Sequence, residues 1–409
     1  MPWYLHLALR QLFPTGRWFP FFTVISALGV ALGVSLLLIV MSVMSGFAQG
    51  IKHLIVDTEG EVQVVARGPV ANYEALVRKI EAVPGVQAAT PYAHDAVMIK
   101  LGDKPAFPML RGLDLESVEK VTNLSRYVIE GSMDQLDDDS VILSVQLAAS
   151  LGARVGDTIE IYSPLIINKL SADEVFLPRQ VRVVGIIEFG HQQFDSSTVY
   201  GTLRLAQDLY GLGSTVHGID VRLKDGVNED DAAARINAIL PPDIRALSWE
   251  DSFSDFLWVV NLERGMIFFL LLFIIIVAAF SVMSSLLISV VRKTREIGLL
   301  GALGGRPAQV AACFCAQGLI IGIVGTAAGI AFGFAALAVR NDIVLWIMKV
   351  TQRQEVLRRF YQFSELPSYT SGTTVALIVI LTIVISTLAG LLPAWKAARL
   401  KPVEALRSE

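Results

Sequence analysis

Charged residues are scarce in this chain, which excludes an ordinary soluble protein. Only 18% of the 409 residues are Asp, Glu, Lys or Arg, whereas 53% are hydrophobic, and the mean hydropathy is +0.56. Soluble domains carry about one quarter charged residues. Four stretches have no charged residue at all: 18–51, 266–291, 307–339 and 366–395. Each holds the roughly 20 apolar residues that a helix needs to cross a bilayer, so we expect four membrane-spanning helices.

Cysteine is nearly absent, and this excludes a disulfide framework. The two cysteines, Cys313 and Cys315, both fall in the third apolar stretch. Residues two apart point to different sides of a helix, so these thiols are not expected to pair. Any domain outside the membrane must therefore be stabilised by its own hydrophobic core.

The motifs of common catalytic sites are also missing. The glycine cluster 301–306 lacks the Lys-Ser/Thr pair that contacts phosphate and magnesium in a Walker A loop. The five histidines are scattered, and neither a His-Glu-x-x-His pattern nor a Gly-x-Ser-x-Gly elbow occurs. No acidic residue lies in an apolar stretch where it could relay protons. We therefore expect no catalytic residue, metal site or cofactor in this chain, and no nucleic-acid partner.

Basic residues give the orientation of the helices. The first apolar stretch is longer than the hydrophobic region of a signal peptide, and no small-x-small cleavage site follows it. With the N-terminus inside, the cytoplasmic pieces hold ten basic and three acidic residues, whereas residues 46–265 hold 19 basic and 32 acidic ones. An excess of Lys and Arg marks the cytoplasmic side, so both termini are expected to be cytoplasmic.

These features divide the chain into nine segments. We expect a cytoplasmic leader (1–18), a first membrane helix (19–45), a large extracytoplasmic domain (46–265), a second helix (266–291), a cytoplasmic loop (292–309), a third helix (310–339), a short outer loop (340–372), a fourth helix (373–394) and a cytoplasmic tail (395–409). The predicted fold class is an α-helical membrane protein with an α+β domain inserted between helices one and two.

The large domain shows alternating strand and helix patterns. Residues 61–66 alternate like a strand, and 72–83 has helical spacing before the Pro84-Gly85 stop. A similar pattern returns over 217–247. Two βαβ-like pieces are thus expected to bracket a middle β-rich section over 140–211, as in a split ferredoxin-like arrangement.

The cytoplasmic loop is expected to contain a short amphipathic helix. Ile297, Leu300 and Leu303 recur at helical spacing, with Leu299 alongside, and basic residues stand at both ends. Such a helix can present an apolar ridge to the groove of a partner. An interfacial loop that only satisfies the positive-inside rule explains the same pattern, and the residues leave both interpretations open.

A second unusual segment is the apolar loop 163–178. It is bounded by Pro164 and Pro178 and would expose large side chains unless something covers them. Those side chains are Leu165, Ile166, Ile167, Val175 and Phe176. Small residues also follow helix three at positions 318, 322, 325, 329 and 333, and helix one at 29 and 33, where they permit close helix packing. For helix three, packing within one chain is the preferred interpretation.

Four segments of the chain have distinctive motifs: 26–34 (SALGVALGV), 41–47 (MSVMSGF), 295–304 (REIGLLGALG) and 393–407 (PAWKAARLKPVEALR). They resemble the corresponding segments of the lipoprotein-releasing permeases, within the broader superfamily of FtsX- and MacB-type permeases. The third and fourth are shared across the superfamily, whereas the end of helix one and the layout of the outer domain are similar to the narrower family. Order, length and topology agree over essentially the whole chain.

The resemblance implies an inner-membrane transporter with several partners. In such a system a separate ATPase binds ATP and magnesium, and a second permease copy or paralogue completes a dimer. A lipoprotein substrate leaves the outer leaflet for a periplasmic carrier, which a projecting loop of the outer domain hooks. The loop at the matching position here is 163–178, with the carrier contacts expected at Pro164, Leu165, Ile166, Ile167, Phe176 and Pro178.

Two further groups of residues are hypothesised to form sites. The ATPase contact is expected at Arg295, Glu296, Leu299, Leu300, Leu303 and Arg306. Acyl chains are expected to lie against Met44, Phe47, Leu262 and Met266, because Met and Phe conform to irregular lipid shapes. Two alternatives remain open, namely a regulatory permease that controls cell-wall hydrolases and an export permease coupled to an outer-membrane channel.

Overall fold

Four helices are long and apolar enough to cross a membrane in the computed structural model, which describes residues 3–12, 21–163, 178–190, 195–351 and 367–400. They are Phe21–Glu59, Ser254–Arg292, Pro307–Ala338 and Gly372–Ala398. The chain forms two compact units. We call residues 1–49, 259–350 and 365–409 the membrane unit and residues 50–258 the sheet unit.

The first two long helices extend well past the expected membrane segments. Helix α2 (Phe21–Glu59) and helix α11 (Ser254–Arg292) have 39 residues each. At about 1.5 Å per residue this is roughly 58 Å, nearly twice the hydrocarbon core of about 30 Å. Helix α2 therefore continues beyond residue 45, and α11 begins before residue 266. The extra turns of α2 keep an apolar stripe, since Ile51, Ile55 and Val56 are buried in one cluster with Trp249.

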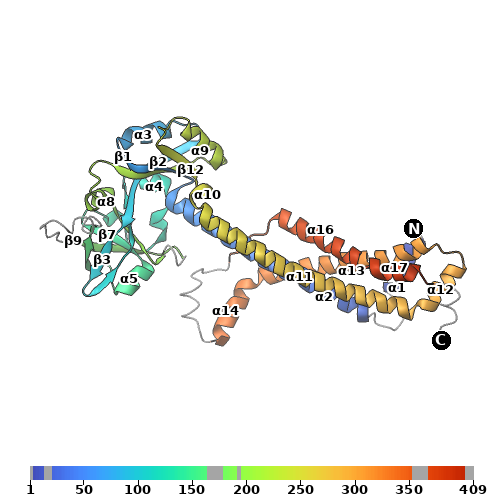
Figure 1. Ribbon diagram of the computed structural model, residues 1–409. Coiled ribbons are helices and arrows are strands. Elements are labelled where there is room, and N and C mark those ends of the chain that lie inside the picture. The colour runs from blue at the N-terminus through green and yellow to red at the C-terminus, as the bar shows by residue number, and fades with distance from the viewer. Residues whose placement is uncertain (1–2, 13–20, 164–177, 191–194, 352–366, 401–409) are drawn as a thin grey trace, which may run out of the picture. The chain divides into compact units, whose positions relative to one another are not determined.

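The remaining helices of the membrane unit are short, apart from α13 and α16. Their bounds are α1 Trp3–Leu12, α12 Thr294–Ala302, α13 Pro307–Ala338, α14 Arg340–Thr351, α16 Gly372–Ala389 and α17 Leu391–Ala398. Figure 1 shows α13, α16 and α17 running together. The buried centre combines Leu37 of α2, Ile275 of α11 and Ile321 of α13 in one cluster. Helix α1 is held on α13 by a hydrogen bond from Gln317 Nε2 to Gln11 Oε1 (2.7 Å).

The glycines of α13 bring its backbone against two neighbouring helices. A Cβ on Gly318 would stand 2.8 Å from the Ser386 carbonyl oxygen of α16, and one on Gly329 would stand 2.6 Å from the Ala31 oxygen of α2. These distances are shorter than real carbon contacts, so no side chain fits. The glycine row serves packing within one chain, as its sequence pattern predicts. Gly29 differs, because a Cβ there meets no described atom within 4 Å.

The sheet unit contains one mixed sheet. In the described part of the chain its strands are β1 Val62–Val70, β2 Val86–Ala96, β3 Met98–Leu101, β4 Lys104–Ala106, β5 Met109–Leu113, β6 Val128–Gly131, β7 Ser140–Ser144, β8 Thr158–Tyr162, β9 Arg179–Ile187, β10 Thr198–Thr202, β11 Val216–Leu223 and β12 Ile244–Ser248. Their order is β12-β1-β11-β2-β5-β10-β7-β9-β8-β3-β4, with β6 on β9.

Strands from both ends of the sheet unit are interleaved in one half of the sheet. Strand β1 lies antiparallel between β11 and β12, and β11 pairs antiparallel with β2. Helices α3 (Tyr73–Glu81) and α9 (Glu229–Asn237) cover this half (Figure 1). The two βαβ pieces read in the sequence thus interdigitate, because neither alone could bury residues such as Val62, Ile80 and Val221.

The other half of the sheet contains the middle section of the sequence. Helices α5 (Val145–Leu151) and α8 (Leu203–Tyr210) pack on this half, whereas α4 (Val118–Val121) packs on β2 and β11, and α10 (Trp249–Ser252) leads into α11. Strands β5 and β10 pair in parallel, as do β7 and β9. The Thr202 hydroxyl caps α8 by accepting a hydrogen bond from Leu205 N (3.1 Å). Helix α5 and strand β8 both lie within the middle section, residues 140–211.

The glycine row generates a prediction with an internal control. Gly329→Ala adds a methyl group where the α2 backbone already lies, and we expect a loss of about 1–3 kcal/mol of stability. Gly29→Ala adds the same methyl group to open space, and should be neutral or stabilising by about 0.5–1 kcal/mol. Unfolding of both variants in detergent, followed by circular dichroism, measures the difference. Equal stability of the two variants would contradict this packing.

Candidate functional site

The short helix α12 lies between two tight connections. Helix α11 ends at Arg292, Lys293 forms the turn, and α12 begins at Thr294. After Ala302 the chain turns at Gly304, whose φ of +94° is strained for any residue with a side chain. Helix α13 then starts at Pro307, capped by a hydrogen bond from Arg306 N to Gln309 Oε1 (3.0 Å). Both ends of α12 are thereby fixed.

One face of α12 is buried and another is exposed. Ile297 is buried in a cluster with Phe314 of α13 and Ala394 of α17. Leu299 and Leu303 point outward, with 53% and 77% of their surface exposed. An apolar surface of this kind on a helix anchored from behind is typical of a protein contact.

The other residues expected at the ATPase contact lie around the same turns. Arg295, Glu296 and Arg306 are exposed, whereas Leu300 is half-buried. All six residues lie within positions 295–306, so the sequence itself places them on one short segment, and their role in an ATPase contact stays a prediction. We call Glu296, Leu299 and Leu303 the coupling face.

The four residues expected to contact acyl chains divide into two environments. Leu262 and Met266 stand four residues apart on α11, and about half of each is exposed, 47% and 56%. Met44 and Phe47 on α2 are half-buried. Residues four apart share one face of a helix, so Leu262 and Met266 form a continuous apolar strip.

Sequence reasoning missed a contact made by the same part of α2. The Ser42 carbonyl accepts a hydrogen bond from Tyr369 N (2.9 Å), and its hydroxyl accepts one from Thr370 Oγ1 (2.8 Å). A Cβ on Gly46 would lie 2.5 Å from the carbonyl carbon of Pro367. Ser42 and Gly46, the small residues of the 41–47 motif, therefore pack against residues 367–370, which lead into α16. Only the i, i+4 spacing of Ser42 and Gly46 hinted at this contact.

The expected carrier hook falls largely outside the described residues. Pro164, Leu165, Ile166, Ile167 and Phe176 are not described, and Pro178 is half-buried. The two ends of the loop are described, and residues at both ends contact the same helix, α8. The Ser163 hydroxyl donates a hydrogen bond to the Leu209 carbonyl.

At the other end of this loop, Arg179 forms ion pairs with Asp208 (3.1 Å) and Asp139 (3.2 Å). Asp208, like Leu209, belongs to α8. Both ends of the loop are therefore attached to well-packed structure.

A charged cluster joins the last turn of α2 to the sheet, and no sequence pattern predicted it. Arg111 of β5 lies 3.1 Å from a Glu59 carboxylate oxygen and pairs with Asp220 of β11. Its guanidinium also stacks over the Tyr92 ring, 4.5 Å from the ring centre. Burial raises the pKa of Asp220 to about 7, against the opposing effect of Arg111. The Arg111 guanidinium thus pairs with the carboxylates of both Glu59 and Asp220. Because its pKa is raised, Asp220 accepts a proton more readily than an ordinary aspartate.

Metal ligation receives no support from the described residues. None of their His, Cys, Asp and Glu side chains form a group of three or more that could hold an ion.

Two family models and several curated relatives match this chain. The MacB-like periplasmic core domain matches residues 23–239, and the FtsX-like permease C-terminal matches residues 268–402. The lipoprotein-releasing system transmembrane protein LolC of Neisseria meningitidis is 30% identical over 400 residues, which cover 95% of this chain and 94% of that protein. The chain belongs to the family of lipoprotein-releasing permeases.

Relatives with lower sequence identity match nearly the same length of the chain. LolC of Xylella fastidiosa is 29% identical over 95% of this chain and 94% of that protein. LolE of Haemophilus influenzae is 24% identical over 94% of this chain and 93% of that protein. The FtsX-like match contains α12, and the MacB-like match contains the ends of the 163–178 loop and Arg111.

The Arg111 cluster gives the second prediction. Arg111→Met keeps the buried volume but leaves the Glu59 and Asp220 carboxylates without their cation, which should cost about 3–5 kcal/mol. Hydrogen exchange of the full chain in detergent should show faster exchange in β1 and β11. Lys100→Met is the matched control, since Lys100 pairs with Asp103 on the surface at 3.9 Å and should contribute less than about 1 kcal/mol. Unchanged protection in Arg111→Met would refute a stabilising role for the cluster.

Proposed function

We propose that this protein is the permease subunit of an ABC transporter that extracts lipoproteins from the outer leaflet of the inner membrane and passes them to a periplasmic carrier. The observation that carries the proposal is the 30% identity to a lipoprotein-releasing protein over nearly the full length of both chains. The regulatory and export alternatives are not favoured, because relatives with the lipoprotein-releasing name match from end to end. Both termini are proposed to be cytoplasmic and the sheet unit periplasmic.

Reconstitution tests the proposal directly. The permease is placed in liposomes with its ATPase and a fluorescent triacylated lipoprotein, and carrier is added outside. Transfer of lipoprotein to the carrier that depends on ATP supports the proposal. ATP hydrolysis without any transfer would favour the regulatory alternative instead.

A separate ATPase is proposed to bind at the coupling face. This chain contains no Walker A loop. Leu299 and Leu303 are exposed on the surface of the chain, while α12 itself is anchored by the burial of Ile297. ATP and magnesium would be bound by that partner. A second permease, either another copy or a paralogue, would complete the dimer.

Acyl chains of the substrate are proposed to lie against the exposed strip of α11. Each CH₂ group moved out of water gains about 0.8 kcal/mol, so extraction requires an apolar receiving surface. Leu262 and Met266 offer such a surface, and Met44 and Phe47 are proposed to contribute from α2.

The loop 163–178 is proposed to bind the carrier. Its apolar residues would serve as a few strong anchors, and its attachment to α8 through Ser163 and Arg179 would limit the ordering cost of binding.

The coupling face yields the third prediction. In Leu299→Asp/Leu303→Asp two carboxylates would enter an apolar contact, so we expect the affinity for the ATPase to fall by about 2 kcal/mol or more. Both side chains are exposed, so the fold should be unaffected. Co-purification and substrate-stimulated hydrolysis measure the effect, and Leu299→Met/Leu303→Met serves as the conservative control. Normal assembly of the Asp variant would rule out this contact.

The acyl-chain strip yields the fourth prediction. A photocrosslinker at Leu262 or Met266 should capture lipoprotein, whereas one at Phe332 of α13, which is even more exposed at 64%, should not. Captured lipoprotein is identified by mass spectrometry of the crosslinked band. Capture at Phe332 alone would exclude the α11 strip as the site.

The carrier loop yields the fifth prediction. Ile166→Asp should weaken carrier binding by at least about 2 kcal/mol without lowering the melting temperature. Ile129→Asp is the control, because Ile129 is an exposed isoleucine of the same unit outside the loop. Carrier pull-downs and thermal melts are run in parallel on the full chain. A lowered melting temperature with unchanged carrier capture would mean that Ile166 belongs to the core.

A further inference from the structure

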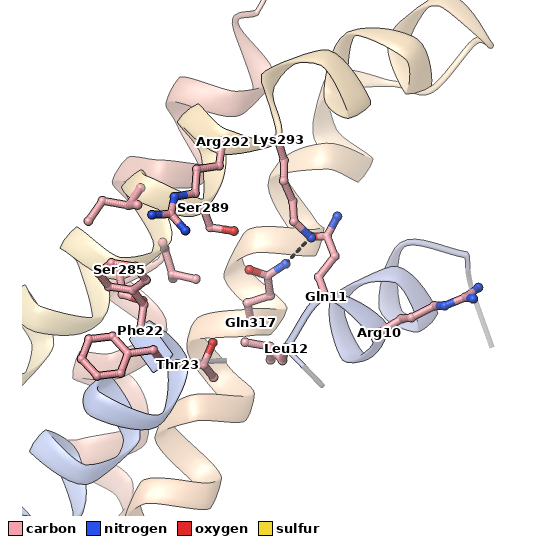
Figure 2. Close-up of a pocket in the computed structure, with 13 residues that line it drawn as sticks. Arg10, Gln11, Leu12, Phe22, Thr23, Ser285, Ser289, Arg292, Lys293 and Gln317 are labelled. Atoms are coloured by element: carbon pink, nitrogen blue, oxygen red, sulfur yellow. Dashed lines mark hydrogen bonds between the residues drawn. The ribbon is translucent and has the colours of Figure 1, made fainter. Parts of the chain in front are cut away.

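A cavity of about 440 Å³ lies within the membrane unit (Figure 2). It is bounded by the end of α1, the start of α2, the end of α11 and the middle of α13. Its described lining includes three basic residues, Arg10, Arg292 and Lys293, and no acidic residue. None of the proposed coupling, acyl-chain or carrier contacts line it.

Polar groups in the cavity come from all four helices and from the turn that follows α11. Figure 2 shows the Lys293 side chain directed toward Gln11, whereas Arg10 points away from the other labelled residues. The Arg292 guanidinium lies over the Phe22 ring, 5.1 Å from its centre. Gln317 is almost fully buried and donates its amide hydrogen to Gln11 Oε1. Two cations and two amides thus surround a space that also has the Ser289 hydroxyl on its wall.

The two cations have no acidic partner in the structure as described. Neither Arg292 nor Lys293 forms an ion pair with a described carboxylate. Like charges on adjacent residues repel each other, and an anion between them would relieve that repulsion. The charge of this cavity is therefore complementary to a phosphate group.

An apolar groove continues from the same place. A second cavity of about 230 Å³ shares Leu12 and Thr23 with the first, and apart from Thr23 its walls are apolar. It follows α2 and α13, with Leu28 on one side and Val324 on the other. A free anion would occupy only the basic cavity. An amphiphile with an anionic headgroup and an acyl chain would fill both the basic cavity and the apolar groove.

We propose that the two cavities together bind one anionic phospholipid from the cytoplasmic leaflet. Its phosphate would lie between Arg292 and Lys293, and one acyl chain would lie in the groove between α2 and α13. Basic pockets between membrane helices on the cytoplasmic side are suited to lipid headgroups. The lipid would join the start of α2 to the end of α11, and would stabilise the membrane unit by mass action.

The test compares lipids on the purified full chain in a neutral detergent. Native mass spectrometry and melting temperature are recorded with added phosphatidylglycerol, phosphatidylcholine or inorganic phosphate. We expect phosphatidylglycerol to bind and raise the melting temperature more than the zwitterionic lipid does. R292Q/K293Q should weaken phosphatidylglycerol binding by about fivefold for each charge removed. K396Q is the matched control, because Lys396 is an exposed cation of α17 outside the cavity, and it should bind normally.

A second variant tests the acyl-chain half of the site separately. Ala328→Phe places a ring in the apolar groove and should weaken phospholipid binding while both cations remain. Equal binding of the two lipids to the wild-type chain would overturn the proposal. So would phospholipid binding that Ala328→Phe leaves unchanged, or inorganic phosphate that stabilises the chain as well as the lipid does, since each outcome removes the need for the groove.

Discussion

The backbone of α13 lies in direct contact with two other helices, α16 over its first half and α2 over its second. In a bilayer, apolar side chains gain nothing by leaving lipid for protein, so helices are held together by close van der Waals contact and hydrogen bonds. Gly322 faces Ser386 and Gly329 faces the Ala31 carbonyl oxygen at distances that leave no room for a methyl group. Because α13 cannot slide along either neighbour without a clash, it fixes the positions of both helices.

The positions of α1 and α12 both depend on the placement of α13. Its first turns supply Val310 and Phe314, which bury Ile297 and so direct the leucines of α12 outward. Further along, Gln317 holds Gln11 and with it helix α1. The same helix therefore positions both the surface proposed to bind the ATPase and the polar part of the cavity proposed to bind phospholipid. The surface proposed to contact the ATPase must be rigid to transmit force, and the burial of Ile297 against Val310, Phe314 and Ala394 supports α12 from the opposite side.

The sheet unit is stabilised differently from the membrane helices. Burying its apolar side chains removes them from water, which is favourable. Its core is continuous through both halves of the sheet. Helix α2 enters this unit with a charged last turn, where Asp57 lies 4.0 Å from Arg222 and Glu59 lies 3.1 Å from Arg111. The cost of burying Arg111 is offset by two carboxylates and an aromatic ring. A helix that is apolar in the membrane thus ends in specific polar contacts.

The sequence by itself determined the features that depend on local composition. Missing charge located the four membrane helices, the helical spacing of Ile297 and Leu303 predicted α12, and glycine spacing predicted the packing face of α13. Tertiary structure alone decided what joins distant residues. Arg111 and Asp220 are 109 positions apart, and Gln11 and Gln317 are 306 apart. The full length of α2 was also missed, because its last turns are amphipathic and are held as a helix by Trp249. The cavity proposed to bind phospholipid could not be predicted, since four helices supply its walls and no single segment carries the pattern.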